Sequence, residues 1–295
     1  MIPVKRPATA IPAPWAIKAE AETAAAIAAY KAALKKWRTL KGKKKKPLDF
    51  TFKYKVYGDD LVRAAINDLY KFKCAYCETH YGVSQPVAVE HYRPKGEVIE
   101  GKARVKPGYY WLAATADNLL PSCTDCNSPR RQPEPDGTER VRGKGNHFPL
   151  AKGSRRAKTP GGEKREVPLL LHPEKDEPEK HLEFLVASDR LGVVRAALIN
   201  GIPSPKGEAS IEVCALDRPR LVMDRRSEAM RLVSHLNNTR DWLRLHRSNP
   251  ANPDFKKSFD RNIAELREMI GQGQKYLAMQ KAILRAEFPE HANLL

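Results

Sequence analysis

Four cysteines arranged as two identical pairs are the strongest chemical signal in the sequence. The pairs are Cys74-Ala-Tyr-Cys77 and Cys123-Thr-Asp-Cys126, with 45 residues between them. Each pair can present two thiolates to one metal ion, and four thiolates complete the tetrahedral coordination of a structural zinc ion. The repeated spacing argues against four unrelated buried cysteines. The sequence therefore predicts one closed zinc site that joins two distant parts of the chain.

Three residues that could act on a phosphodiester lie beside these pairs. Glu90 and His91 lie between the two pairs, and Asn127 directly follows the last cysteine. Carboxylate and amide oxygens suit Mg²⁺ or Mn²⁺. A histidine can accept a proton from an attacking water near neutral pH. We therefore predict phosphodiester hydrolysis, in which Glu90 and Asn127 hold a catalytic Mg²⁺ or Mn²⁺ ion and His91 is the general base.

The order of these residues resembles the HNH (ββα-metal) nuclease motif, which reads Glu-His-x-x-Pro, then Asn-Leu, then Cys-x-x-Cys-Asn in this chain. More narrowly, segments 73–78, 89–95 and 117–123 resemble the PtuB family, the HNH subunits of Septu and retron-linked anti-phage defence systems. Segments 144–150 and 168–173 extend the similarity over most of the chain.

The resemblance implies an α+β fold, in which a zinc-knuckle-framed ββα-metal (HNH) core has flanking helices and a C-terminal helical hairpin. It implies a metal-dependent endonuclease that cleaves DNA, or an RNA such as a tRNA, as the effector of a defence complex. The implied partner is an ABC-type ATPase subunit of the PtuA kind. In some systems a retron reverse transcriptase and its DNA product join them.

The chain departs from the HNH pattern at one ligand position. Many HNH sequences place a third metal ligand four residues after the first ligand of the helix. That position here is Arg131, which cannot bind a cation. We therefore expect Glu90 and Asn127 to be the protein ligands, with phosphate and water completing the coordination. Asn118 is predicted to tie the loop together by hydrogen bonds and to orient His91.

The net charge favours a polyanionic partner. The 295 residues include 53 Lys and Arg against 35 Asp and Glu, which gives a net charge of +18. Basic and acidic side chains number 14 and 5 in residues 1–60, 11 and 5 in residues 129–166, but 8 and 7 in residues 61–128. Such a distribution would draw a phosphate backbone towards the near-neutral centre. The candidate nucleic-acid-binding residues beside the motifs are Arg93, Lys95, Arg130, Arg131 and Lys144.

Two other classes of protein would share some of these features. A zinc-stabilised nucleic-acid-binding adaptor would keep the cysteines and the basic charge, but it has no need of Glu90, His91 and Asn127. A thiol redox protein needs one reactive Cys-x-x-Cys pair and leaves the second pair unexplained. The endonuclease is therefore our first hypothesis, and the adaptor is the alternative.

We expect a cytoplasmic protein without a membrane segment, because the first residues form no apolar signal and no apolar run reaches about 18 residues. Four parts are predicted along the chain. They are an N-terminal arm, helix and basic linker at 1–58, the HNH nuclease core at 59–150, a basic loop with short strands at 151–216, and a C-terminal helical region at 217–295.

Periodicity and turn residues place elements around the motifs. Helices are expected at residues 16–40, 59–70, 124–131, 219–247 and 254–287. Short strands are expected at 87–91, within 96–108, and at 168–171, 183–186, 192–198 and 209–215. Residues 129–166 are predicted to be a long loop. The aromatic run Tyr109–Trp111 is expected to fill the core rather than to stack on bases.

Overall fold

The computed structural model describes residues 1–42, 47–81, 88–134 and 136–289. Its α-helices are α1 (Ala13–Thr39), α2 (Asp60–Leu69), α3 (Thr124–Asn127), α4 (Pro205–Cys214), α5 (Pro219–Ser248), α6 (Pro253–Met269) and α7 (Leu277–Glu287). Its strands are β1 (Ala88–His91), β2 (Val98–Glu100), β3 (Ala103–Val105), β4 (Leu119–Ser122), β5 (Arg130–Pro133), β6 (Glu139–Arg142), β7 (Leu182–Phe184), β8 (Val194–Ala196), β9 (Leu198–Ile199) and β10 (Ile202–Pro203). Helices mixed with small antiparallel strand pairs confirm the predicted α+β class.

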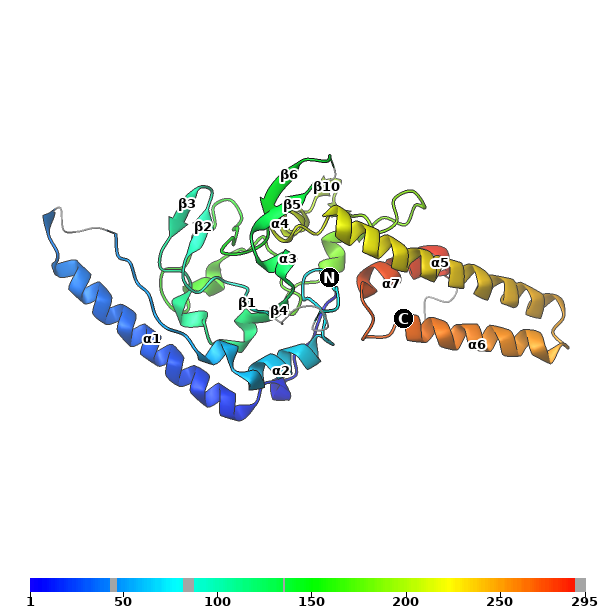
Figure 1. Cartoon of the computed structure of the whole chain (residues 1–295), viewed down its shortest axis with the longest axis horizontal. Helices are drawn as coiled ribbons and strands as arrows, with labels where there is room; N and C mark the ends of the chain where they lie inside the picture. The colour runs from blue at the N-terminus through cyan, green and yellow to red at the C-terminus, as the bar shows by residue number, and fades with distance from the viewer. Residues whose placement is uncertain (43–46, 82–87, 135, 290–295) are drawn as a thin grey trace.

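The strands lie in the middle of the molecule, between two helical extensions (Figure 1). Helix α1 runs along one side, and the hairpin of α5 and α6 projects from the opposite side. The N-terminus lies beside α7, where Met1 and Leu277 line one cavity. The first residues of the chain therefore meet the C-terminal helices next to the central strands.

The strand pair β1–β4 carries the first candidate residues. The two strands are antiparallel, with Glu90 opposite Leu120 and His91 opposite Leu119. Both leucines are fully buried, so apolar packing holds the pair in register. Strand β4 then leads directly into Cys123, the N-cap residue of α3. This order fixes Glu90 and His91 relative to the second cysteine pair.

The strands expected within residues 96–108 are present, but neither of them pairs with β1. Strands β2 and β3 do lie there, but they form a hairpin of their own, in which Val98 pairs with Val105. The partner of β1 is β4. The local β pattern identified the segment as extended, but tertiary packing selected the partner.

The helix expected at residues 124–131 is a single turn. Helix α3 ends at Asn127, and Ser128 is extended with φ −90° and ψ 125°. Because a proline disfavours the α conformation in the residue before it, Pro129 stops the helix. The chain continues as the hairpin β5–β6, so residues 129–166 are not one long loop. The complete ββα-metal core therefore remains a prediction.

The second predicted helix delivers the first cysteine pair. The Asp59 carboxylate caps α2 by accepting a hydrogen bond of 2.9 Å from the amide of Leu61. Val62 and Ile66 are buried, whereas Leu61 is 43 % exposed. The chain turns after α2 and enters the first pair at Cys74.

The C-terminal helices form the predicted hairpin, with two differences. Helices α5 and α6 lie antiparallel (Figure 1), but the helix expected at 254–287 is divided between Met269 and Leu277 into α6 and α7. The strand expected at 209–215 is instead part of α4. The Ser204 hydroxyl accepts from the amide of Gly207 at 3.2 Å and Pro205 opens the helix, which together form a strong helix start.

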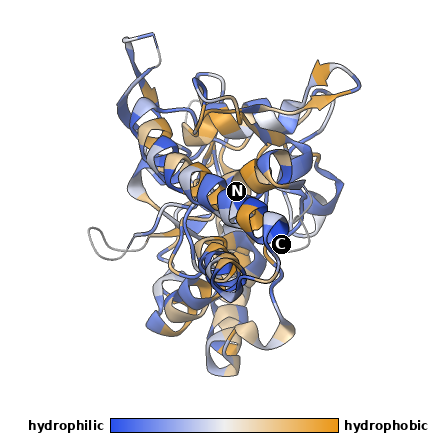
Figure 2. Ribbon diagram, turned by 90° about the vertical axis from the view of Figure 1, so that its right-hand side faces the viewer, coloured by the Kyte–Doolittle hydropathy of each residue, from blue (hydrophilic) through white to orange (hydrophobic). Residues whose placement is uncertain are grey.

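The aromatic run Tyr109–Trp111 lies in the core, and the helices carry mixed surfaces. Tyr109, Tyr110 and Trp111 are buried, which confirms their predicted place in the core. Figure 2 shows hydrophilic and hydrophobic residues interleaved along the helices. Across the described ranges, no helix is both long and apolar enough to cross a membrane.

Candidate functional site

The four cysteines of the two pairs form one buried cluster. Their sulfur atoms all lie within 4.8 Å of one another, and Cys77 Sγ is 3.7 Å from Cys123 Sγ. A tetrahedral zinc ion with Zn–S bonds of about 2.3 Å would place its sulfur ligands about 3.8 Å apart. The residues present therefore fit a structural zinc ion. Within the described ranges, this is the one group of three or more His, Cys, Asp or Glu side chains that could hold a metal ion.

Coupling among the four cysteines lowers the pKa of Cys74 and Cys77 and raises the pKa of Cys123 and Cys126. Hydrogen bonds from Cys123 and Cys126 hold the pKa of Cys77 well below its ordinary value. Thr79 Oγ1 lies 3.2 Å from Cys77 Sγ, and the Nη1 of Arg218 lies 3.6 Å from Cys126 Sγ. A zinc ligand must be deprotonated, so these neighbours support metal binding.

Glu90 is buried and paired with a lysine from the loop after β6. Lys144 is fully buried, and its Nζ lies 2.5 Å from Glu90 Oε1. The same ammonium donates to the carbonyl of His91 at 2.8 Å. Burial raises the pKa of Glu90, and the attraction of Lys144 opposes this shift. The candidate carboxylate ligand is therefore already neutralised by an internal cation.

His91 is held in one tautomer. Its Nε2 lies 3.0 Å from the carbonyl oxygen of Ala113. A carbonyl can only accept, so Nε2 carries the hydrogen and Nδ1 keeps its lone pair in the neutral ring. Burial, reinforced by the charge of Lys95, lowers the pKa of His91 to about 3. The ring also packs edge-on against Tyr57, with the centroids 4.6 Å apart. At neutral pH His91 is thus an uncharged imidazole.

Asn118 ties together two segments on either side of the hairpin β2–β3. Its Oδ1 accepts from the amide of Arg93 at 2.7 Å, and its Nδ2 donates to the carbonyls of Arg93 and Leu112 at 3.0 Å each. The chain following His91 is thereby fixed to the segment that contains Ala113. The orientation of His91 by Asn118 stays a prediction.

Asn127 lies at the end of α3 and is half-buried. Its backbone amide donates to the carbonyl of Cys123 at 3.1 Å, and its carbonyl accepts from the amide of Gly145 at 2.6 Å. The amide of Lys144 donates to the carbonyl of Cys126 at 2.8 Å. These bonds connect the second cysteine pair with the loop that supplies Lys144. Helix α3 also contacts strand β1.

The donor set around Glu90 does not fit a Mg²⁺ or Mn²⁺ ion in this arrangement. One carboxylate is offered, and its Oε1 is occupied by a buried ammonium. A divalent cation bound there would lie beside the positive charge of Lys144, which costs Coulomb energy in a buried site. Ion binding at Glu90 and Asn127 would require Lys144 to release the carboxylate.

The five predicted nucleic-acid-binding residues differ in their surroundings. Arg93 pairs with Glu166 at 3.0 Å and its side chain is 12 % exposed. Lys95 Nζ lies 4.2 Å from the centre of the Tyr57 ring. The side chain of Arg131 is 81 % exposed.

The remaining two residues, Arg130 and Lys144, differ in burial. Arg130 is half exposed and pairs with Asp125. Lys144 lies in the interior, so the expected phosphate contact by this residue does not hold in this structure. The sequence suggested a surface role for Lys144 because glycines flank it, and only the structure reveals its buried partner Glu90.

Two residues of the site could not be found from the sequence. Tyr57 reaches His91 from the segment before α2, and Arg218 reaches Cys126 from the start of α5. Pro219 marks the beginning of a helix and so identifies Arg218 as a flanking residue. Neither residue belongs to a motif, so no local signal points to the site.

Comparison with known proteins gives two relatives from Bacillus mycoides (strain KBAB4). The Septu protein PtuB is 33 % identical over 231 residues, which is 75 % of this chain and 71 % of that protein. The Septu protein PtuA is 30 % identical over 154 residues, which is 51 % of this chain and 18 % of that protein. No protein-family model matches the chain, and no solved structure matches it. The extent of the first similarity places this chain in the Septu PtuB family.

Proposed function

We propose that this protein is an HNH-type endonuclease that hydrolyses phosphodiester bonds of DNA, with RNA as the alternative target. The observation that carries the proposal is the fixed tautomer of His91 at the end of β1, in which Nε2 carries the hydrogen and Nδ1 keeps its lone pair. Glu90 lies next to it on β1, and the buried cysteine cluster lies at the end of the paired strand. A pure binding protein has no need of such a base.

In the proposed reaction His91 acts as the general base. Its Nδ1 accepts a proton from the water that attacks phosphorus, and the bond to the 3′ oxygen breaks as that oxygen takes a proton from solvent water. Lys144 keeps the Glu90 carboxylate and the His91 carbonyl in place, which holds the imidazole at the end of β1. A general base of this kind contributes about 10²–10⁴-fold to the rate.

The zinc ion would have a structural role. Cys74, Cys77, Cys123 and Cys126 would hold it, and four thiolates leave no open position for a substrate. The expected Mg²⁺ or Mn²⁺ ion at Glu90 and Asn127 remains a prediction, because the Lys144 ammonium holds the carboxylate. No step of the proposed reaction depends on that ion.

The biological setting is proposed from the relatives. One is named a Septu protein PtuB and the other a Septu protein PtuA. We infer that this chain acts in the cytoplasm in a Septu-type defence system, together with a PtuA-like ATPase subunit. A retron reverse transcriptase and its DNA are further proposed partners in systems that contain one.

The decisive experiment compares His91→Ala with the wild-type protein and with His80→Ala. His80 is exposed and bonds the carbonyl of Gly273 at 2.7 Å, away from β1, so it is a matched histidine control. Each pure protein is incubated with DNA and with RNA, with and without its PtuA-like neighbour, in Mg²⁺, Mn²⁺ or EDTA. We expect cleavage by the wild type and His80→Ala, and at least a hundredfold loss in His91→Ala. Equal digestion by the wild type and both variants would contradict the assignment of His91 as the general base.

The alternative is a zinc-stabilised adaptor that binds nucleic acid without cutting it. The Glu90–Lys144 ion pair favours this alternative, because it withdraws the one carboxylate beside His91 from ion binding. Retained binding without cleavage under all of these conditions would select the adaptor.

A further inference from the structure

Arg218 reaches the cysteine cluster from the start of the C-terminal helices. Its Nη1 lies 3.6 Å from Cys126 Sγ and donates to the carbonyl of Ala215 at 2.9 Å. The side chain is 7 % exposed. The carboxylate nearest to it is Asp125, whose Oδ2 lies 3.7 Å from Arg218 Nε and which also pairs with Arg130. The buried guanidinium therefore approaches a cysteine sulfur as closely as it approaches a carboxylate.

A second arginine lies two helical turns further along α5. Arg225 is 1 % exposed, and its Nη1 donates to the carbonyl of Leu216 at 2.7 Å. Its guanidinium lies over the rings of Phe184 and Tyr276, at 5.2 and 5.8 Å from their centres. Within the described part of the chain, its Nε has no hydrogen-bond partner and no carboxylate pairs with it. The positive charge of Arg225 thus needs another source of compensation.

Burial lowers the pKa of Arg225, and the charge of Cys77 is the largest of the effects that oppose this shift, so a zinc tetrathiolate would supply that compensation. One Zn²⁺ ion with four thiolates carries two net negative charges, and two arginines carry two positive ones. An isolated charge in the protein interior is strongly unfavourable, whether it belongs to the metal centre or to a guanidinium. The four-cysteine cluster and the two arginines therefore stabilise each other only when the cysteines are ionised.

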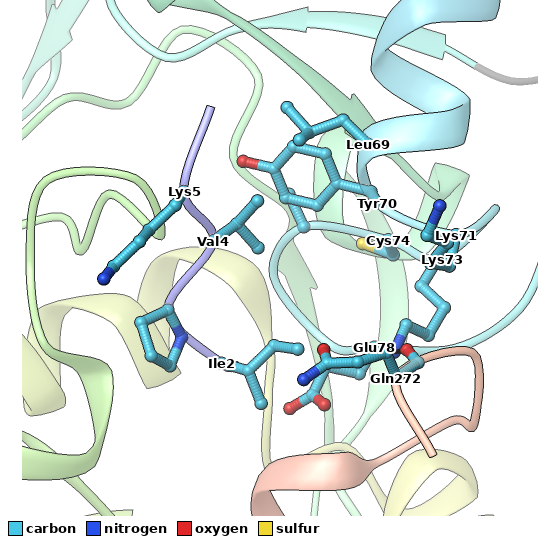
Figure 3. Close-up of a pocket in the computed structure, with 12 residues that line it drawn as sticks. Ile2, Val4, Lys5, Leu69, Tyr70, Lys71, Lys73, Cys74, Glu78 and Gln272 are labelled. Atoms are coloured by element: carbon cyan, nitrogen blue, oxygen red, sulfur yellow. Dashed lines mark hydrogen bonds between the residues drawn. The ribbon is translucent and has the colours of Figure 1, made fainter. Parts of the chain in front are cut away.

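The segment before α7 contacts the two residues that flank the first cysteine pair. Lys73 Nζ donates to the carbonyls of Gln272 and Gln274 at 2.6 and 2.8 Å. The Glu78 carboxylate accepts from the amide of Ala278 at 3.2 Å. Figure 3 shows Lys73, Glu78 and Gln272 gathered at one place, beside the pocket that Cys74 lines. The C-terminal region therefore contacts Cys126 of the second pair and the residues that flank the first pair.

We propose that the zinc centre is the electrostatic anchor of the C-terminal helical region. Arg218 and Arg225 neutralise the zinc tetrathiolate, and the bound metal in turn fixes α5 and α7 against the two cysteine pairs. The proposal concerns the zinc ion and these two positioning residues. It makes no use of cleavage, so a failure of the proposed nuclease function would leave it standing.

The first test measures the rate at which the full-length zinc protein loses its metal to an excess of a chromogenic chelator. The variants are Arg218→Met and Arg225→Met. The controls are Arg220→Met and Arg226→Met, which remove exposed arginines from the same helix. We expect release to be faster by about tenfold or more in the two buried variants, as for other residues that support metal ligands. Release at the control rate in both buried variants would overturn the proposal.

A second test needs no variant, so it holds even if the arginine variants fold poorly. Hydrogen–deuterium exchange of the wild-type protein is compared before and after zinc is removed. Anchoring predicts that exchange rises in residues 272–288 while α1, on the opposite side of the molecule, stays protected. Unchanged exchange in 272–288, or simultaneous loss of protection in α1 and α7, would contradict it.

Discussion

The Nζ atom of Lys144 lies 2.5 Å from Glu90 Oε1, and both side chains are buried. The backbone amide of this lysine donates to the carbonyl of Cys126, and its ammonium donates to the carbonyl of His91. One residue therefore joins the strand that carries the candidate base to the second cysteine pair. Its loss should affect both the stability of the fold and the environment of Glu90.

We expect Lys144→Met to destabilise the protein by about 3–5 kcal/mol, because it leaves the Glu90 carboxylate buried without a partner. Urea unfolding with zinc present gives the free energy of unfolding. Lys152→Met, at an exposed position in the next segment, should change it by about 0.5 kcal/mol or less.

The double variant Glu90→Gln/Lys144→Met removes both charges and should recover part of the loss. Recovery is expected because the cost comes from the unpaired charge rather than from the lost contact. A double variant no more stable than Lys144→Met would show that the lysine acts through packing instead.

Asn118→Ala should destabilise the protein by about 1–3 kcal/mol, because backbone groups of Arg93 and Leu112 lose their buried partners. Exchange of the Arg93 amide should rise in the same variant. The control is Asp117→Ala, whose side chain is 62 % exposed. Equal stability of the two variants would mean that Asn118 does not tie the loop.

His172 should make the stability depend on pH. Burial lowers its pKa to about 4, while the carbonyl of Asp117 opposes this shift. Its Nδ1 accepts from the amide of Glu174 at 3.1 Å, which requires the neutral ring. Because the folded pKa lies below the unfolded value of about 6.5, the stabilisation is complete above pH 6.5 and is lost as the pH falls through 4.

The full loss from His172 amounts to roughly 3 kcal/mol. His172→Asn keeps an acceptor near the position of Nδ1 but does not titrate. Its free energy of unfolding, measured between pH 4 and 7, should therefore fall less steeply with decreasing pH than that of the wild type. Parallel curves for the two proteins would exclude His172 as a source of the dependence.

Cys126→Ser should abolish stoichiometric zinc binding. Removing one of four ligands leaves an open tetrahedral site, and structural zinc contributes directly to folding free energy. Metal analysis of the wild type should give about one zinc ion per chain. Cys214→Ser is the matched control, since Cys214 is buried but lies outside the cluster. A full zinc complement in Cys126→Ser would refute the four-cysteine site.

The local pattern of the sequence determined the α+β class and the grouping of Cys74, Cys77, Cys123 and Cys126. These features depend on neighbouring residues or on a repeated spacing that one tetrahedral ion imposes. The sequence also placed Glu90 and His91 at the end of a strand, which β1 confirms.

Only the tertiary structure decided what these residues meet. The partner of β1 is β4 rather than the nearer β2 or β3. Lys144 pairs with Glu90 from 54 residues away, and Arg218 reaches Cys126 from 92 residues away. Such contacts follow from how helices and strands pack around the buried core, and no periodicity or spacing within a segment encodes them.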